Sequence, residues 1–471
     1  MCEIPYFRFK RIFKDTHYGR KSAKVLDYIE EHKEEYLELL LRFCRQPSVA
    51  ATGEGIEKMA GMVVEELKKL GVEPTVLETG GSPFIYGEIK GEVDRTFGFY
   101  DHYDVQPVDP IDEWITPPYS ADIRDGVIYA RGVADNKDGL VTRLCAVDAW
   151  QKVHGKLPLN VKFCFEGEEE TGSPHLASVA KAHPEMIQCD GYVWEGGHRE
   201  EGGPAEITMG VKGLLYVELY AKVSEKDAHS MYAAIMPSPV WHLVQALNTL
   251  RDKDGNVLID GFYDGIQPIS QAELDALKTD VFDEEDTRKN ILGIEKFIND
   301  EHGEDLLKRL YYRPTCNICG ITAGYQGEGS KTVLPGKASC KIDFRLVPGQ
   351  DPDRILKLLR QHLDQHGFAD IEIKCNSGCP AFRSDPNSPF CKAIVRTMEE
   401  LFHEQPCVQC TSGGTSPMYI FCKEANIPAA MFGASSKNAN IHSPNEHLAV
   451  EAFYNMIRIN ATMMYEFAHQ E

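Results

Sequence analysis

Acidic and histidine residues repeatedly follow short apolar runs of this sequence. The apolar runs lie at residues 97–100, 161–165, 192–194 and 429–432. The side chains that follow them are, in chain order, His102 with Asp104, Glu169 with Glu170, Glu195, and His442. In open α/β sheets, ligands bind at the edge where the strands end. We therefore expect these side chains to meet at one edge of a sheet.

His102 and Asp104 are two residues apart, so on an extended chain they point to the same side. A histidine that binds a metal needs a hydrogen-bond acceptor for its second ring nitrogen, because without that acceptor the orientation of the ring is not fixed. Asp104 is predicted to be that acceptor, directly or through a rotated loop. The alternative is an ordinary surface pair, because short motifs of this kind are common.

Asp135 lies in a predicted turn between a short strand and a helix that begins near Leu140. A carboxylate has two oxygens and can bridge two cations, which a neutral imidazole ligand cannot do. The alternative is that Asp135 caps the N-terminus of the following helix. Local sequence does not separate these two hypotheses.

The loop at residues 166–170 contains four glutamates, which repel one another unless cations or solvent neutralise them. A solvated loop is the alternative, but an apolar strand precedes this loop and a glycine closes it. Glu169 and Glu170 point in different directions, so one can bind a metal while the other handles protons. Together these oxygen and nitrogen ligands suit zinc or manganese, not metals that prefer thiolates.

Strands that alternate with helices must position these side chains, and this pattern is typical of an open, largely parallel sheet. An amphipathic helix is predicted at residues 56–70. The middle of the chain differs: strands at 210–223 and 337–346 and helices at 240–250, 272–310 and 353–366 predict an inserted α+β domain. The fold class is thus α/β with helices on both sheet faces, and the predicted domains are 1–211, 212–383 and 384–471, the first and last forming one catalytic domain.

The 72 acidic and 50 basic residues give a formal charge of -22, which opposes binding to nucleic acid or anionic membranes. Residues 1–21 contain no apolar core typical of a secretory signal, and no apolar run approaches the length of a membrane span. The 14 cysteines are interpreted as reduced core residues. A cytoplasmic location is expected. The two CxxC pairs, at 316–319 and 407–410, are too far apart for a compact zinc ribbon.

Eight segments spread over nearly the whole chain resemble one enzyme family. In chain order they read HYDVQP, ARGVADNK, FEGEEETGS, DAHS, KTVLPGK, FRLVP, SGGTSP and HSPNE. They are similar to those of the co-catalytic metallopeptidases, which include aminoacylase, glutamate carboxypeptidase and succinyl-diaminopimelate desuccinylase. The chain length and the insertion resemble the branch of cytosolic nonspecific dipeptidases and carnosinases.

The resemblance implies two divalent ions, zinc or alternatively manganese. His102 and Glu195 would hold one ion, Glu170 and His442 the other, and Asp135 would bridge them. Two close cations can polarise a carbonyl and lower the pKa of a shared water molecule toward neutrality. Glu169 would take the proton of that water and return it to the leaving amine. Asp104 is expected to support the catalytic centre.

The inserted domain contains four further residues of this resemblance. His229 resembles a histidine that reaches the active site of a partner in a homodimer and stabilises the developing oxyanion. Arg345 resembles the arginine that binds the substrate's carboxylate, and Thr332 and Thr415 resemble residues that line the same pocket. The alternatives are a capping or surface role for His229 and a strand ion pair for Arg345.

Some positions depart from the dipeptidase pattern. Glu195 stands where dipeptidases of this family generally have aspartate and where carboxypeptidases and deacylases have glutamate. Asp101 and Asp138 replace small residues, and Ser412 and Thr415 also differ. The leading hypothesis is a peptidase acting on dipeptides or similar small peptides, and the alternative is an N-acyl-amino-acid amidohydrolase or carboxypeptidase. An inactive binding scaffold would lack ligands or the base, and none of these residues is missing.

Overall fold

The computed structural model describes residues 19–200 and 202–470, and its chain divides into two compact units. The first unit contains the described residues of Met1–Gly210, Ser384–Cys410 and Ile420–Glu471. The second contains Val211–Arg383 and Thr411–Tyr419. The segment 411–419 thus belongs to the second unit, although the predicted domains assign it to the returning part of the first. Most of residues 1–21, the segment without an apolar core typical of a secretory signal, lies outside the described residues.

The first unit is built on a mixed sheet whose central strands are parallel. The strand order is β1-β2-β6-β3-β7-β18-β8-β17. β3 is parallel to both β6 and β7, and β7 is parallel to β18. β1 is antiparallel to β2, β2 to β6 and β8 to β18, while β17 is parallel to β8. The bounds are β1 (Thr75–Leu77), β2 (Phe84–Ile89), β3 (Val93–His102), β6 (Leu159–Glu166), β7 (Gly191–Trp194), β8 (Glu206–Thr208), β17 (Cys407–Gln409) and β18 (Ala429–Met431).

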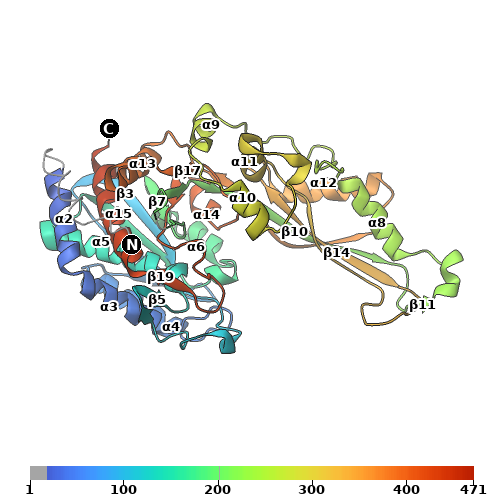
Figure 1. Ribbon diagram of the computed structural model, residues 1–471, viewed down its shortest axis with the longest axis horizontal. Coiled ribbons are helices and arrows are strands. Elements are labelled where there is room, and N and C mark those ends of the chain that lie inside the picture. Colours follow the sequence, from blue (N-terminus) through green and yellow to red (C-terminus); the bar gives the residue numbers. More distant parts are fainter. Residues whose placement is uncertain (1–18, 201, 471) are drawn as a thin grey trace. The chain divides into compact units, whose positions relative to one another are not determined.

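Helices pack on both faces of this sheet. Neighbouring side chains of β3 point in opposite directions, so this strand contacts helices on both sides. Phe97 contacts Phe390 and Phe467, which belong to α13 (Pro389–Phe402) and α15 (Val450–His469). Tyr100 points to the other face, where it contacts Phe421 of α14 (Tyr419–Cys422). Figure 1 shows α15 beside α5 (Asp138–His154), and both helices contact β3. The predicted α/β class is confirmed.

Further elements complete the first unit. The helix predicted at 56–70 is confirmed as α4, whose apolar positions Met59, Val63 and Leu67 are fully buried. A small antiparallel sheet, β19-β5-β4, contacts the segment Val133–Lys137 through β19. The remaining bounds are α2 (Gly19–Glu31), α3 (Lys33–Cys44), α4 (Ile56–Lys69), α6 (Leu176–Ala182), α7 (Pro184–Ile187), β4 (Asp122–Arg124), β5 (Val127–Tyr129) and β19 (His447–Ala449).

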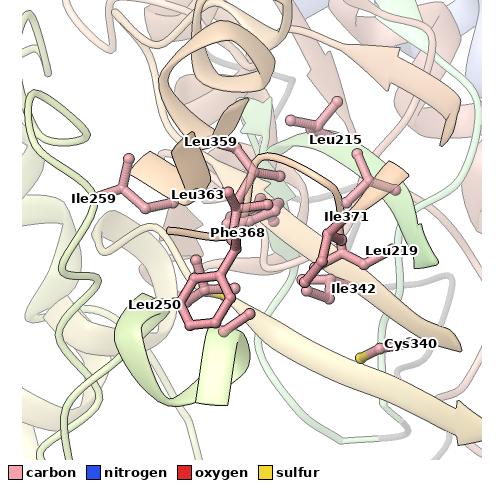
Figure 2. Close-up of a cluster of buried hydrophobic side chains, with 14 of the residues drawn as sticks. Leu215, Leu219, Leu250, Ile259, Cys340, Ile342, Leu359, Leu363, Phe368 and Ile371 are labelled. Atoms are coloured by element: carbon pink, nitrogen blue, oxygen red, sulfur yellow. The ribbon is translucent and has the colours of Figure 1, made fainter. Parts of the chain in front are cut away.

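The second unit contains an antiparallel sheet in the order β12-β14-β10-β15. Alternate residues of β10 are buried, as expected for a sheet with one covered face. α8 and α12 cover that face, and Figure 2 shows the apolar side chains packed between them and the strands. The bounds are β10 (Gly213–Lys222), β11 (Ala228–His229), β12 (Asn317–Ala323), β13 (Val333–Leu334), β14 (Lys337–Leu346), β15 (Glu372–Cys379), α8 (Pro239–Leu250) and α12 (Pro352–Gln365).

The helical stretch predicted at 272–310 is divided into short helices. They are α9 (Gln271–Leu277), α10 (Glu284–Asp286) with η5 (Thr287–Ile291) directly after it, η6 (Ile298–Asp300) and α11 (Gly303–Tyr312). Gly293, Asn299 and Asp300, which lie between α10 and α11, have positive φ angles, a conformation that an α-helix does not continue through. Across residues 19–200 and 202–470, no helix has the length and apolar character needed to cross a membrane.

Candidate metal centre

The structure brings all five predicted ligands together in the first unit. β3 ends at His102, β6 ends just before the Glu169–Glu170 loop, and β7 ends directly before Glu195. The ligands form two groups that share Asp135. Within each group, one candidate ligand atom per residue lies within 4.8 Å of the others. The groups are His102 with Asp135 and Glu195, and Asp135 with Glu170 and His442.

Asp135 presents its two carboxylate oxygens to two different histidines. Oδ1 lies 3.1 Å from His102 Nε2, and Oδ2 lies 3.0 Å from His442 Nε2. The helix-cap alternative does not describe this side chain, because α5 begins after Lys137 and has no side-chain cap hydrogen bond. A carboxylate that faces two imidazoles with separate oxygens has the geometry of a bridging ligand.

Asp104 holds one ligand from each group. His102 Nδ1 lies 3.1 Å from the carbonyl oxygen of Asp104 and 3.3 Å from its Oδ1, which leaves Nε2 of the ring facing Asp135. The backbone N–H of Glu170 donates to Asp104 Oδ2 at 3.0 Å. His102 and Asp104 are both fully buried. The acceptor predicted from their spacing is therefore present.

Glu170 and His442 complete the second group. His442 Nε2 lies 3.1 Å from Glu170 Oε2, which also accepts a hydrogen bond from Gln106 Nε2 at 2.9 Å. The other oxygen of Glu170, Oε1, is buried without a hydrogen-bond partner within the described part of the chain. Burying a carboxylate oxygen without a donor is costly. A cation would satisfy this oxygen, so the residues present fit a bound metal ion.

Burial, and after it repulsion between neighbouring carboxylates, raises the pKa of two acidic side chains of the site. Burial, with the charges of Asp135 and Glu170 adding to it, raises the pKa of Glu169 to about 7. Burial and the charge of Glu169 raise the pKa of Glu195 well above its usual value. Hydrogen bonds to Asp135 and Glu170 raise the pKa of His442 to about 10. A site with this excess of negative charge favours cations.

Glu446 holds the loop that carries Asp135, a role that sequence reasoning missed. Its carboxylate is buried and ion-paired with Arg131 at 2.8 Å. It also accepts hydrogen bonds from three backbone N–H groups of this loop, those of Gly132 at 2.8 Å, Ala134 at 2.9 Å and Asp135 at 3.1 Å. The only signal in the sequence is its place four residues after His442. This spacing does not indicate that Glu446 contacts the loop of Asp135.

Arg143 of α5 connects three ligand-bearing segments beneath the site, and sequence reasoning missed it too. Its Nε lies 3.0 Å from Asp101, the residue before His102. Its Nη2 donates at 3.1 Å to the carbonyl of Trp194, the residue before Glu195. Asp101 in turn accepts a hydrogen bond at 3.1 Å from Asn136, the residue after Asp135. One buried guanidinium thus orients the backbone around the first ligand group.

Replacing Arg143 with methionine is expected to lower the free energy of unfolding by roughly 3 kcal/mol, because Asp101 then remains buried without its counter-ion. Chemical denaturation of the metal-free protein measures this loss. Adding Asp101→Asn to the same variant should recover part of the stability, since no buried charge is left alone. Equal stability of the single and double variants would contradict this account of the ion pair.

The four predicted substrate-binding residues belong to the second unit. Arg345 Nη1 donates a hydrogen bond to Thr415 Oγ1 at 2.8 Å. Arg345 Nε lies 3.9 Å from Asp343 on the same strand, so the alternative strand ion pair is also present. His229 is exposed, and its Nδ1 accepts a hydrogen bond from the N–H of Met231 at 3.1 Å, which is a local capping role. Thr332 lies close to His229, because the carbonyl oxygen of Thr332 accepts a hydrogen bond at 3.3 Å from the N–H of Ser230, the residue after His229.

Comparisons with known proteins agree with this geometry. Residues 98–466 match the model of peptidase family M20/M25/M40. The Beta-Ala-His dipeptidase of Mus musculus is 29% identical over 93% of this chain and 93% of its own length. The Cys-Gly metallodipeptidase DUG1 of Candida albicans is 27% identical over 92% of this chain and 94% of its own.

A solved structure is also similar. The M20 family metallo-carboxypeptidase Sso-CP2 from Sulfolobus solfataricus has a TM-score of 0.85 and 37% identity, covering 92% of this chain and 99% of the other. The family match extends over most of the chain and includes all five residues of the two candidate ligand groups. The resemblance inferred from the eight sequence segments is therefore confirmed. This chain belongs to peptidase family M20/M25/M40.

Proposed function

We propose that this protein is a metal-dependent hydrolase that cleaves the amide bond of dipeptides or similar small peptides with a free carboxyl terminus. The observation that carries the proposal is Asp135, whose two oxygens lie 3.1 Å and 3.0 Å from two different histidine nitrogens. This arrangement suits two neighbouring cations, and relatives that match over nearly the full chain are named dipeptidases. A cytoplasmic location is part of the proposal and is supported by the described cysteines, which are free thiols.

Two divalent ions, zinc or alternatively manganese, would be held by the two ligand groups. Imidazole and carboxylate ligands suit both metals, and no cysteine occurs in either group. His102 and Glu195 would bind one ion, Glu170 and His442 the other, and Asp135 both. Bound divalent ions supply Lewis acidity, which lowers the pKa of water and polarises a carbonyl group.

Glu169 is proposed as the general base. It adjoins the ligand Glu170, and its own carboxylate belongs to neither ligand group. In the metal-free protein, burial raises its pKa to about 7, and a carboxylate beside the two ions can act as a proton acceptor and donor. Glu169 would accept a proton from the attacking water and deliver it to the leaving amine nitrogen. Asp104 would keep His102 and Glu170 oriented through its two contacts.

Arg345 is proposed to bind the carboxylate of the substrate, with Thr415 and Thr332 lining the same subsite. Arg345→Lys keeps the charge but removes the planar fork that pairs with a carboxylate. We expect KM for a dipeptide to rise about tenfold, with a smaller change in kcat. The same dipeptide with an amidated carboxyl terminus provides the control, since wild type and variant should handle it equally. An equal change in KM for both substrates would contradict the assignment.

A homodimer is also proposed, in which His229 of one protomer acts in the active site of the second. The segment that follows His229 exposes large apolar side chains: Met231 is 69% exposed, Ile235 81% and Trp241 68%. Such a concentration of exposed apolar surface is typical of a protein interface. Sedimentation analysis tests the assembly, and a monomer at micromolar concentration would rule it out.

A carboxypeptidase or N-acyl-amino-acid amidohydrolase is the second candidate. Glu195 favours it, and the Sulfolobus solfataricus metallo-carboxypeptidase is 37% identical to this chain. The test is a panel of dipeptides, longer peptides and N-acyl amino acids, assayed with zinc or manganese and after chelation. Turnover of dipeptides that chelation abolishes supports the first proposal, and turnover confined to acylated or longer substrates replaces it with the second. Turnover unaffected by chelation overturns both.

Metal affinity is expected to rise with pH. In the metal-free protein, burial alone lowers the pKa of His102, but Asp104 and Asp135 outweigh burial and raise this pKa well above its usual value. Hydrogen bonds to Asp135 and Glu170 raise the pKa of His442 to about 10. Both histidines are therefore protonated at neutral pH in the metal-free protein, and a metal ion must displace these protons. Each displaced proton makes binding about tenfold tighter per pH unit. Zinc titration between pH 6 and pH 8 measures this slope, and a pH-independent affinity would contradict it.

A further inference from the structure

The second unit contains a cavity whose walls carry more positive than negative charge. Its volume is about 760 Å³, within the range of small-molecule sites. The walls combine aromatic and aliphatic side chains with neutral polar groups such as Asn256 and Asn317. The charged lining residues are Arg251, Arg309, Arg313, Arg345 and a single carboxylate, Asp343.

Two of these arginines already have acidic partners. Arg309 forms a two-pronged ion pair with Glu301. Arg345 lies 3.9 Å from Asp343, whose carboxylate also accepts a hydrogen bond from Asn317 at 2.7 Å. Four guanidinium groups therefore face two carboxylates. An excess of two positive charges remains at the cavity.

Arg251 and Arg313 carry this excess. Neither guanidinium forms an ion pair or side-chain hydrogen bond with any residue in 19–200 or 202–470. Arg251 lies against Gly255, where an added β-carbon would be only 3.0 Å from Arg251 Nη2, and both residues line the cavity. Both side chains remain accessible to a ligand, since both residues are exposed.

A further cation lies beside this cluster. Lys212 donates a hydrogen bond at 2.7 Å to the carbonyl oxygen of Arg313. Burial, with the nearby positive charge of Arg345, lowers the pKa of Lys212 to about 8. Positive groups thus repel one another on this side of the second unit. Clusters of this kind in a concave site attract anions, and each guanidinium can bind one carboxylate through two parallel hydrogen bonds.

We propose that the cavity binds a small molecule that carries two carboxylates, which pair with the arginines Arg251, Arg313 and Arg345 of its walls. Two sources share this chemistry. One is a free dicarboxylate, and the other is a peptide substrate whose last residue is aspartate or glutamate. The second source rests on the proposed function, because Arg345, the proposed partner of the substrate carboxylate, lines the same cavity.

The first experiment measures glutarate binding by calorimetry on the metal-free protein, with butyrate as the single-carboxylate comparison. We expect glutarate to bind about tenfold more tightly than butyrate, and Arg251→Gln or Arg313→Gln to weaken glutarate binding about tenfold each. Lys253→Gln is the matched control: Lys253 lies on the same loop as Arg251, pairs with Asp254 and does not line the cavity. Equal binding of the two anions, or equal affinity of the arginine variants and wild type, would overturn the proposal.

The second experiment identifies the source with the metal-loaded enzyme. If the substrate supplies the carboxylates, KM is lower for Ala-Glu than for Ala-Gln, and Arg313→Gln raises KM about tenfold for Ala-Glu alone. If a free dicarboxylate is the ligand, glutarate still binds while the two dipeptides share one KM in both proteins. Failure of the enzyme to cleave any dipeptide would refute the proposed function, yet the calorimetry on metal-free protein would still decide whether the cavity binds dianions.

Discussion

Glu169→Gln is expected to lower kcat for a dipeptide by about 10³-fold while both metal ions stay bound. Glutamine has nearly the same shape as glutamate but cannot accept the proton of the attacking water. Burial raises the pKa of Glu169 to about 7 in the metal-free protein, so the native carboxylate can take up a proton where glutamine cannot. Steady-state kinetics together with elemental analysis of metal content measures both parts of this result.

Glu168→Gln is the matched control for this experiment. Glu168 is the preceding residue of the same loop, and its carboxylate lies 2.8 Å from His175 Nδ1 and outside both ligand groups. We expect this variant to retain activity within about threefold, since Glu168 has no part in proton transfer. Retained turnover in Glu169→Gln, or an equal loss in both variants, would remove the assignment of the base.

Asp135→Asn is expected to reduce bound metal from about two ions per chain to one or fewer, and to lower kcat/KM by about 10³-fold or more. An amide has one oxygen and no negative charge, so it cannot bridge two cations or balance their repulsion. The two contacts of Asp135 to His102 and His442 show which ligand groups depend on it. Metal content after dialysis, followed by kinetics at saturating metal, provides the measurement.

Asp138→Asn separates loss of the bridging ligand from a general loss of buried carboxylates near the site. Asp138 lies three residues further along and belongs to neither ligand group. Burial raises its pKa to about 8, so this side chain is largely uncharged at neutral pH and asparagine preserves its charge. This variant should bind metal as the wild type does. Two tightly bound ions in Asp135→Asn would refute the bridging role.

Much of the candidate site was predictable because it follows strand ends. His102, Glu170 and Glu195 come just after apolar runs that form β3, β6 and β7, and the ends of parallel strands meet at one sheet edge. The spacing of His102 and Asp104 also predicted their contact. These predictions need only local periodicity and the geometry of a parallel sheet.

Other features required contacts between distant segments. Asp135 had two equal interpretations until the structure showed its oxygens beside His102 and His442, the latter 307 residues away. Glu446 and Arg143 have no motif of their own, and their roles follow from backbone groups that they contact far along the chain. The break between α10 and α11 was missed because helical periodicity does not report single residues with positive φ.

The sequence alone determined which chemical groups this protein has available: histidine and carboxylate side chains placed after strands, an adjacent glutamate, and an inserted second unit. These follow from residue type and short-range spacing, which local physics controls. The tertiary structure decided which oxygen faces which nitrogen, which buried groups hold the ligand loops, and where unpaired arginines surround a cavity. Such features depend on packing between segments hundreds of residues apart, and no local pattern specifies the distances that packing sets.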